Sequence, residues 1–551
     1  MAGSLFIIYL LFVFIKNPNI LINPRMWAEE AVVYYQAAMT HTFFSALFME
    51  HIGYFSFVAN TATVLAATLV DIEYAAHITT LISLLVQCIP VVIVVCLSHQ
   101  YFNTTLHKLC FILIYSIGTH FDEIHLNSIN SQHILIGACI LIAIDSYDKI
   151  SRVKLVFYGF VMLLASLSGP GSLFLLPSFS YRLYKEYKRN MYFFYVYMFF
   201  LVGVLVQVVY KLKSQNAYVN REFTSFINSL SILTSKNIFF IISADLSRFI
   251  ADKLQFYMDM LLNNNYLYIM YVLLCIALLF FFFWLISINV NSETKKVLIG
   301  ALFIYSFFSI NFAVGKGSQK FDFMYQIPGS RYFFVSTLIV YLLLYINIYL
   351  FLKKKTKTKT IHQKASVIFS LFIIIISLFL GFLGKFNTMF PGTCPSWREE
   401  ALEWKRNPAY EMRIWPCGII IDGAEQWKFK PKKKLRDDLF GSWDGSVRSV
   451  VNATEITIAA TLYINVFTER SISGSFILAR PGSPAIYFSG VIGLQRWGGE
   501  SNGYYNDMLL QTIDGKTLTA KYWNRVKAIE IYAYGTTETG ENSADFYIFR
   551  Q

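Results

Sequence analysis

Two adjacent acids, Glu29 and Glu30, follow the first long apolar segment, within the run Pro-Arg-Met-Trp-Ala-Glu-Glu-Ala at 24–31. An acid at the centre of a bilayer costs about 2.5–3.5 kcal/mol, so an acid near that boundary usually faces a protein cavity or the wet interface. A carboxylate placed there is able to take a proton from a hydroxyl nucleophile. One of the two is therefore a candidate general base. The alternative is that they cap an interfacial helix beginning near Trp27, where acids favour the positive end of the helix dipole.

A second polar cluster lies in the segment 122–133. Asp122 and Glu123 form either a second acidic cluster, shaping an acceptor or metal site, or a solvated turn between two short helices. Asn127 suits a hydrogen bond to a ligand hydroxyl or, equally well, a helix cap. The sequence alone leaves these alternatives open.

Several cations lie in segments that we place on the same side of the membrane as the acids. Arg331 is the first candidate for an anionic lipid headgroup, because a guanidinium matches the geometry of a phosphate. Lys316, Lys320 and Arg221 are the others.

The composition predicts a multi-pass membrane protein. Hydrophobic residues make up 56% of the chain and aromatic residues 17%, and the mean hydropathy is +0.48. These values exceed what a water-soluble domain of this length needs. The apolar segments fall at 4–22, 54–71, 76–98, 107–119, 133–145, 155–167, 172–181, 192–210, 266–286, 297–314, 331–352 and 366–384.

Basic residues in the short loops indicate the orientation. The lysine-rich run 353–359 is the strongest cytoplasmic marker, which places the acid pair and everything after 385 on the outer side. An odd number of crossings, about eleven, satisfies this arrangement, and 54–71 is the segment that we suspect does not cross. The net charge of +13 follows from these loops, so we expect no nucleic-acid partner. The short segments between 107 and 181 read as broken helices whose connecting turns stay buried in protein.

The composition changes after residue 385. Short β-prone stretches, separated by turn residues, predict a β-sandwich-like domain at 426–551. The expected organisation is a transmembrane domain at 1–384, an extracytoplasmic linker at 385–425 and this β domain. Because Cys394 and Cys417 lie in the exported linker, we expect them to form a disulfide.

Four segments together resemble polytopic GT-C-type glycosyltransferases, and most closely bacterial O-antigen-modifying glucosyltransferases. They are the acid run 24–30, the polar stretch 122–132, the Ser-Gly-Pro turn 168–170 and the Gly-Ser-Arg-Tyr-Phe run 329–333. The resemblance covers most of 1–420, including Trp397 and the Ile-Trp-Pro run 414–416, and ends before the β domain.

The resemblance implies inverting transfer of a sugar, glucose in the most similar enzymes, from a polyprenyl-phosphate-linked donor. The acceptor would be a surface polysaccharide such as O-antigen, at the periplasmic face of the bacterial inner membrane. It implies an acid of the first outer loop as base, which favours Glu29 and leaves Glu30 open. Such donors often need no metal, so we expect no cofactor, with Mg²⁺ or Mn²⁺ held by acids of both loops as the alternative.

Two other classes share several of these features. An O-antigen ligase or polymerase would use a pyrophosphate-linked oligosaccharide at a periplasmic site. A lipid-linked sugar transporter would show repeated halves and ionisable residues near the middle of the bilayer. The acids of this chain lie mainly at the outer boundary, which favours the transferase.

Overall fold

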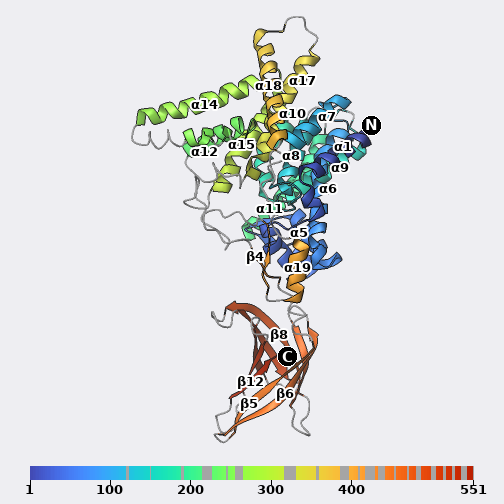
Figure 1. Cartoon of the computed structure of the whole chain (residues 1–551), viewed down its shortest axis with the longest axis vertical. Coiled ribbons are helices and arrows are strands. Elements are labelled where there is room, and N and C mark those ends of the chain that lie inside the picture. The colour runs from blue at the N-terminus through green and yellow to red at the C-terminus, as the bar shows by residue number, and fades with distance from the viewer. Residues whose placement is uncertain are drawn as a thin grey trace. The chain divides into compact units, whose positions relative to one another are not determined.

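The computed structural model describes two compact units (Figure 1). Unit 1 comprises Met1–Ala38 with Thr42–Lys430, and unit 2 comprises Pro431–Gln551 with Met39–His41. The described residues are 1–118, 123–148, 150–187, 191–213, 226–243, 246–247, 249–254, 265–314, 330–354, 359–384, 396–407, 410–415, 428–431 and the strands of unit 2.

Unit 1 is helical, with short strands in its loops. Its first half contains α1 (Ala2–Lys16), α2 (Pro18–Ile22), η1 (Glu30–Tyr35), α3 (Gln36–Thr40), α4 (Phe43–Leu47), β1 (Glu50–His51), β2 (Tyr54–Phe55), α5 (Phe57–Leu69), η2 (Ile72–Tyr74), α6 (Ala75–Val95), α7 (Thr105–Leu113), η3 (Ile114–Gly118), α8 (Ser131–Ile144), α9 (Arg152–Leu167), η4 (Pro170–Leu175) and α10 (Leu176–Glu186). Its second half contains α11 (Tyr192–Lys213), α12 (Phe226–Thr234), η5 (Ser235–Phe239), α14 (Asn265–Ser287), α15 (Ser292–Val314), η6 (Ser330–Phe333), α17 (Phe334–Lys353), α18 (Ile361–Gly384), α19 (Trp397–Arg406), β3 (Met412–Arg413) and β4 (Lys428–Phe429).

Within the described residues, five helices are long and apolar enough to cross a membrane. They are Ile72–Val95, Tyr192–Lys213, Ile269–Ser287, Arg331–Lys353 and Ile361–Phe382. The pair Arg152–Leu167 and Pro170–Glu186 passes the same test together but bends by 116° at its break. The turn at that break is buried at Ser168 and Gly169, as predicted for a broken helix inside protein. The chain therefore has the helices of a multi-pass membrane protein.

The first apolar segment differs from the prediction of one continuous helix over 4–22. The chain breaks at Asn17, and α1 and α2 lie on either side of it. Proline disfavours a helical conformation in the residue before it, and Asn17 precedes Pro18. The break leaves α1 at 15 residues.

The suspected non-spanning segment 54–71 contains the 13-residue helix α5. Ser56, before α5, lies 3.3 Å from the Tyr34 hydroxyl. After α5, Glu73 pairs with Lys405 of α19 at 2.6 Å, and Trp397 of α19 packs against Tyr35. The residues before α5 therefore contact η1, and those after it contact α19.

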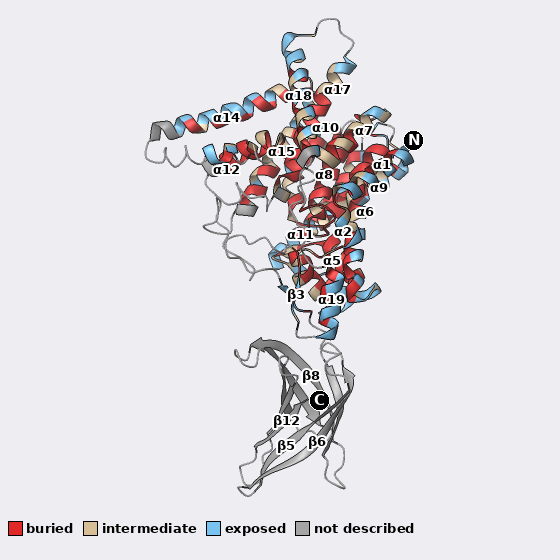
Figure 2. Ribbon diagram, viewed as in Figure 1, coloured by how far each residue is buried: buried red, intermediate tan, exposed pale blue. Residues whose placement is uncertain are grey.

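The core of unit 1 is formed around α8 and α17, which are buried along most of their length (Figure 2). Both helices are apolar on all faces, which is the pattern of a helix surrounded by other helices. α17 has 20 residues and therefore a length of about 30 Å, the thickness of a hydrocarbon layer. Arg331 precedes its first residue and Lys353 ends it, so these two cations lie at opposite ends of the membrane unit.

Basic side chains of α9 and α10 surround Asp145, which follows α8. Its carboxylate accepts hydrogen bonds from the Gln100 amide at 2.8 Å and the Tyr158 hydroxyl at 2.7 Å. Lys154 lies 2.6 Å from the same carboxylate, and Arg182 donates to the Asp145 carbonyl. The buried charge is thereby paired and hydrogen-bonded, as burial requires.

Unit 2 is a closed barrel of antiparallel strands and not the two packed sheets expected from the sequence. The strands are β5 (Gly441–Val451), β6 (Thr454–Phe467), β7 (Ser471–Leu478), β8 (Ile486–Trp497), β9 (Tyr504–Thr512), β10 (Thr517–Trp523), β11 (Ala528–Tyr534) and β12 (Ser543–Phe549). Each pairs with the next along the chain, and β12 pairs with β5 to close the barrel. Short alternating strands are typical of both folds, so the pattern does not reveal the closure.

We predict that Asp145→Ala lowers the free energy of unfolding by about 3–5 kcal/mol, because it leaves Lys154 buried without its carboxylate. The exposed neighbour Asp148 provides the control, and Asp148→Ala should stay within about 0.5 kcal/mol of the wild type. Thermal unfolding of the purified protein in detergent measures both. Equal melting temperatures for the two variants would contradict the assignment.

Candidate functional site

A cavity of about 200 Å³ lies in unit 1 at the end where the acid pair is found. Residues from all four of the segments singled out in the sequence line it. They are Trp27 and Glu29, Asn130 and Gln132, Pro170, and Arg331 with Tyr332. The rest of the lining is Ile129, His133, Gly171, Phe174, Tyr305, Ser309, Tyr34 and the hairpin residues His51, Ile52 and Tyr54. Motifs separated by about 300 positions in sequence thus meet at one place.

Glu30 faces away from this cavity. Its carboxylate accepts a hydrogen bond from the Trp27 amide at 3.0 Å, from the Ser128 amide at 3.3 Å and from the Ser128 hydroxyl. The side chain is buried. Burial raises the pKa of the Glu30 carboxyl, and these hydrogen bonds partly oppose the shift. Glu30 therefore joins the loop after α2 to the loop that contains Ser128.

Glu29 is half-buried and lines the cavity. The Glu29 and Arg331 charges lie close enough to interact. The chain becomes helical here, and η1 is a π-helix; along any helix each side chain is rotated from the one before it. That rotation separates two adjacent acids, one into the cavity and one into the loop contacts. Part of the capping alternative also holds, because Glu30 reaches back to the Trp27 amide as a capping-box residue does.

Glu123 holds Arg331 in place. One Glu123 carboxylate oxygen lies 3.6 Å from the Arg331 guanidinium, and the other accepts the Arg331 backbone N–H at 3.2 Å. Glu123 is buried, whereas the Arg331 side chain keeps 24% of its surface exposed. Arg331 also lies over the Tyr332 ring, 5.1 Å from its centre. The cation is therefore fixed on one side and open to the cavity on the other.

Asn127 caps the turn that precedes α8. Its side-chain oxygen accepts the backbone N–H groups of Ile129 at 3.0 Å and Asn130 at 3.3 Å. Asn130 in turn donates to the Glu123 carbonyl at 2.8 Å. The cavity is lined by Asn130, and Asn127 lies beside a smaller pocket with Arg25.

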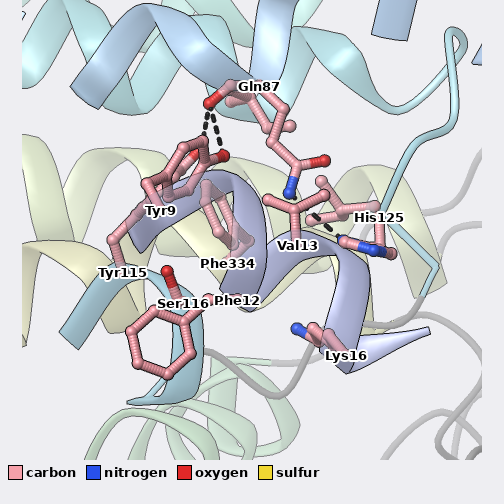
Figure 3. A pocket seen from close by; sticks show the side chains of 11 residues that line it. Tyr9, Phe12, Val13, Lys16, Gln87, Tyr115, Ser116, His125 and Phe334 are labelled. Atoms are coloured by element: carbon pink, nitrogen blue, oxygen red, sulfur yellow. Dashed lines mark hydrogen bonds between the residues drawn. The ribbon is translucent and has the colours of Figure 1, made fainter. Parts of the chain in front are cut away.

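Gln87 of α6 anchors the loop before α8, in part through His125 (Figure 3). Its side-chain oxygen accepts the Leu126 N–H at 3.1 Å, and its side-chain nitrogen lies 3.1 Å from His125 Nδ1. The Gln87 carbonyl accepts the hydroxyls of Tyr9 at 2.9 Å and Tyr115 at 3.2 Å. Leu126 has a φ of 53°, which a bulky side chain rarely adopts. Gln87 therefore fixes the strained turn at Leu126 relative to α6.

The turn 168–171 depends on Gly169. Its φ is 135°, and an added Cβ would lie 2.0 Å from the Gln132 side-chain oxygen. Glycine is thus required both by the backbone and by the close approach of a cavity residue. The Ser-Gly-Pro motif brings Pro170 and Gly171 to the cavity wall.

Sequence reasoning missed the contact between Trp27 and Trp415. The Ala28 amide donates to the Trp415 carbonyl at 2.6 Å, and the two indole rings lie 6.4 Å apart. It also missed His133, whose Nδ1 lies 2.9 Å from the Tyr305 hydroxyl, as a cavity residue. The Trp415 contact places the segment 410–415 beside the acid pair.

Several predicted residues lie outside the described part of the chain. These are Asp122, Arg221, Lys316, Lys320 and the cysteines Cys394 and Cys417. Among the described residues, no group of three His, Cys, Asp or Glu side chains is placed to hold a metal ion.

We predict that the wild type loses stability relative to Glu30→Gln as the pH rises. The pKa of Glu30 is higher in the folded state than in the unfolded state, so the folded protein keeps a proton that the unfolded chain has released. As the pH rises from the ordinary carboxyl pKa to the raised pKa of folded Glu30, the free energy of unfolding therefore decreases. Unfolding at pH 4 and pH 8 measures the difference, with Glu50→Gln, at an exposed carboxyl, as control. A difference independent of pH would count against a buried, titrating Glu30.

Comparisons with protein families, with curated proteins and with solved structures find no match for this chain. The resemblance to GT-C enzymes therefore remains an expectation from the four sequence segments. The functional interpretation depends on the geometry of the cavity.

Proposed function

We propose that this protein transfers a sugar, glucose by the resemblance, from a polyprenyl-phosphate-linked donor to a surface polysaccharide such as O-antigen. The observation that carries the proposal is that Glu29 and Arg331 line one cavity together. A carboxylate and a fixed guanidinium at one cavity are the two groups that this reaction needs. Amide and aromatic side chains, which suit the polar edges and apolar faces of a sugar ring, form the remaining wall.

In the proposed reaction, Glu29 takes the proton of an acceptor hydroxyl as its oxygen attacks the anomeric carbon. The new carbon–oxygen bond forms on the face opposite the phosphate, and the bond to the phosphate oxygen breaks, so the configuration inverts. The lipid phosphate leaves with the bonding electron pair. Arg331 stabilises the charge that develops on it, because Glu123 already holds the guanidinium in position.

The size of the cavity favours a monosaccharide donor. Its volume of about 200 Å³ lies below the range of about 300–1,000 Å³ typical of pockets for drug-sized ligands. An O-antigen ligase or polymerase would need room for an oligosaccharide. A transporter is disfavoured because the acids Glu29, Glu30 and Glu123 lie together at one end of the helices.

The membrane arrangement that we propose with this function has about eleven crossings and the site on the periplasmic face of a bacterial inner membrane. The basic end around Asp145 and Lys353 is then cytoplasmic. Residues 396–431 and unit 2 are periplasmic. No metal is required, because Arg331 supplies the positive charge at the leaving phosphate.

We predict that Glu29→Gln lowers turnover by about 10²–10⁴-fold, while the lipid-linked donor still binds. Glutamine keeps the size of the side chain but does not accept the proton. Mass spectrometry of the surface polysaccharide should show one hexose that depends on the wild-type protein and is absent with the variant. Glu50→Gln is the matched control and should retain activity, since Glu50 is exposed and is not part of the cavity wall. A glycan of unchanged mass in cells with and without the intact protein would refute the proposal.

Replacing the cation should have a different signature. Arg331→Ala should weaken donor binding and slow turnover together, because the same guanidinium contacts the phosphate before and during the reaction. Donor titrations with purified protein separate the two effects. Undiminished donor affinity in Arg331→Ala would move the phosphate site elsewhere.

A further inference from the structure

A group of aromatic side chains connects the lipid-facing surface of unit 1 with the cavity. We call Phe44, Phe48, Phe55 and Tyr210 the aromatic ledge. Phe44 is 69% exposed and Phe48 is 52% exposed. They lie four residues apart, at and just beyond α4, and so share one face. Such exposed rings need an apolar partner in the environment.

The depth of the ledge is set by α11. The Tyr210 hydroxyl donates to the Phe48 carbonyl at 3.0 Å, and Tyr210 stands three residues before Lys213, the end of this membrane-length helix. Tyrosine and lysine at the end of a span mark the membrane–water interface. The Phe55 ring stacks on Tyr210 with centres 5.0 Å apart and on Phe48 with centres 6.1 Å apart. The ledge therefore lies where lipid chains meet the headgroups.

The ledge continues directly into the hairpin of β1 and β2. Gln207 of α11 holds both backbone groups of Phe55, at 2.9 Å and 2.8 Å. The preceding residues His51, Ile52 and Tyr54 line the cavity. A few residues of chain thus separate a surface in contact with lipid from the wall beside Glu29.

The hairpin turn carries strain at Ile52. Ile52 and Gly53 have φ values of 52° and 76°. Asn-Gly is the usual choice for a two-residue turn of this kind, and a β-branched residue with a positive φ is strained. An apolar side chain at this cavity position is therefore kept at the expense of stability, as an apolar contact with a ligand would favour.

We propose that the aromatic ledge binds the isoprenoid chain of the lipid-linked donor and guides its phosphate past Ile52 to Arg331. This inference rests on the proposed function. The chain would lie along Phe44 and Phe48 within the outer lipid layer, with its phosphate and sugar in the cavity. Apolar chains need no directional contacts, and flat aromatic rings at a fixed depth provide a surface on which a branched chain packs. The exposed ring of Phe308 also reaches the cavity, because it stacks on Phe174 with centres 4.9 Å apart, but the exposed ring of Phe372 on α18 makes no ring contact with a cavity residue among the described contacts.

The test uses the full-length protein in lipid nanodiscs and photoreactive isoprenoid phosphates of long and short chain. We expect the long-chain probe to label residues 43–55 and Tyr210. Phe44→Ser with Phe48→Ser should raise the Kd of the long-chain phosphate about tenfold or more, from the apolar area that is lost. The Kd of the short-chain phosphate should stay unchanged. Phe372→Ser is the matched control, because it removes an equally exposed ring from another helix.

Three results would overturn the proposal. They are labelling confined to other helices, an equal loss of affinity for both chain lengths, and equal labelling of the ledge by a photoreactive diacyl phospholipid. Should the double variant fail to fold, the labelling pattern of the wild type decides alone. If labelling of the ledge depends on isoprenoid chain length but no sugar is transferred, the proposed function is refuted and the lipid-binding role of the ledge is retained. If sugar transfer does not depend on chain length or on the ledge residues, the lipid-binding role of the ledge is refuted and the proposed function is retained.

Discussion

The need to satisfy every polar group inside a membrane-embedded protein is the constraint on which this site depends. Helices satisfy their own backbone groups, but the irregular turns between broken helices do not, and lipid offers them no partner. Here two glutamines inside membrane-length helices supply that partner. Gln87 binds the turn at Leu126, and Gln207 binds both backbone groups of Phe55. Each holds a turn with a strained residue, Leu126 or Ile52, and each turn continues into a loop that forms part of the cavity wall. The position of the cavity thus follows from where these glutamines stand in α6 and α11.

The acids show the same constraint for charge. A buried carboxylate is tolerated where hydrogen bonds or a cation replace its water, and this condition divides three similar residues into different roles. Glu30 is surrounded by the donors of Trp27 and Ser128, and Glu123 holds Arg331 through its side chain and its backbone. Glu29 faces the cavity instead. Glu30 and Glu123 are therefore engaged in contacts that hold the loops together, whereas Glu29 lines the cavity.

The sequence indicated which segments lie near one another, but it did not indicate which of their side chains face the cavity. Hydropathy and loop charge located the helices, because burial in lipid is a local property of each segment. The break at Asn17 was equally local and could have been read from Pro18. The choice between Glu29 and Glu30 was not available, since it depends on the rotation of η1 relative to Ser128, a residue about 100 positions away. The contact of Trp27 with Trp415 and the closure of the barrel by β12 and β5 are likewise pairings between distant parts of the chain. Periodicity within a segment carries no information about them.

The pairing of Arg331 with Glu123 preorganises the guanidinium at the cavity. A guanidinium has five N–H donors in one plane, and a carboxylate on one edge leaves the other edge for a ligand. A free arginine beside a cavity would sample many rotamers, and a phosphate would have to order it on binding. Contact with Glu123 orders the Arg331 side chain when the protein folds, and it requires burial of the Glu123 carboxylate. Asn130 holds the Glu123 carbonyl and Asn127 caps the same turn, so the position of the cation is fixed through the second loop as a whole. The polar stretch 123–130 therefore contributes to the cavity both directly, through Asn130, and through Arg331, and a change at Asn127 would alter the orientation of that guanidinium through the turn that it caps.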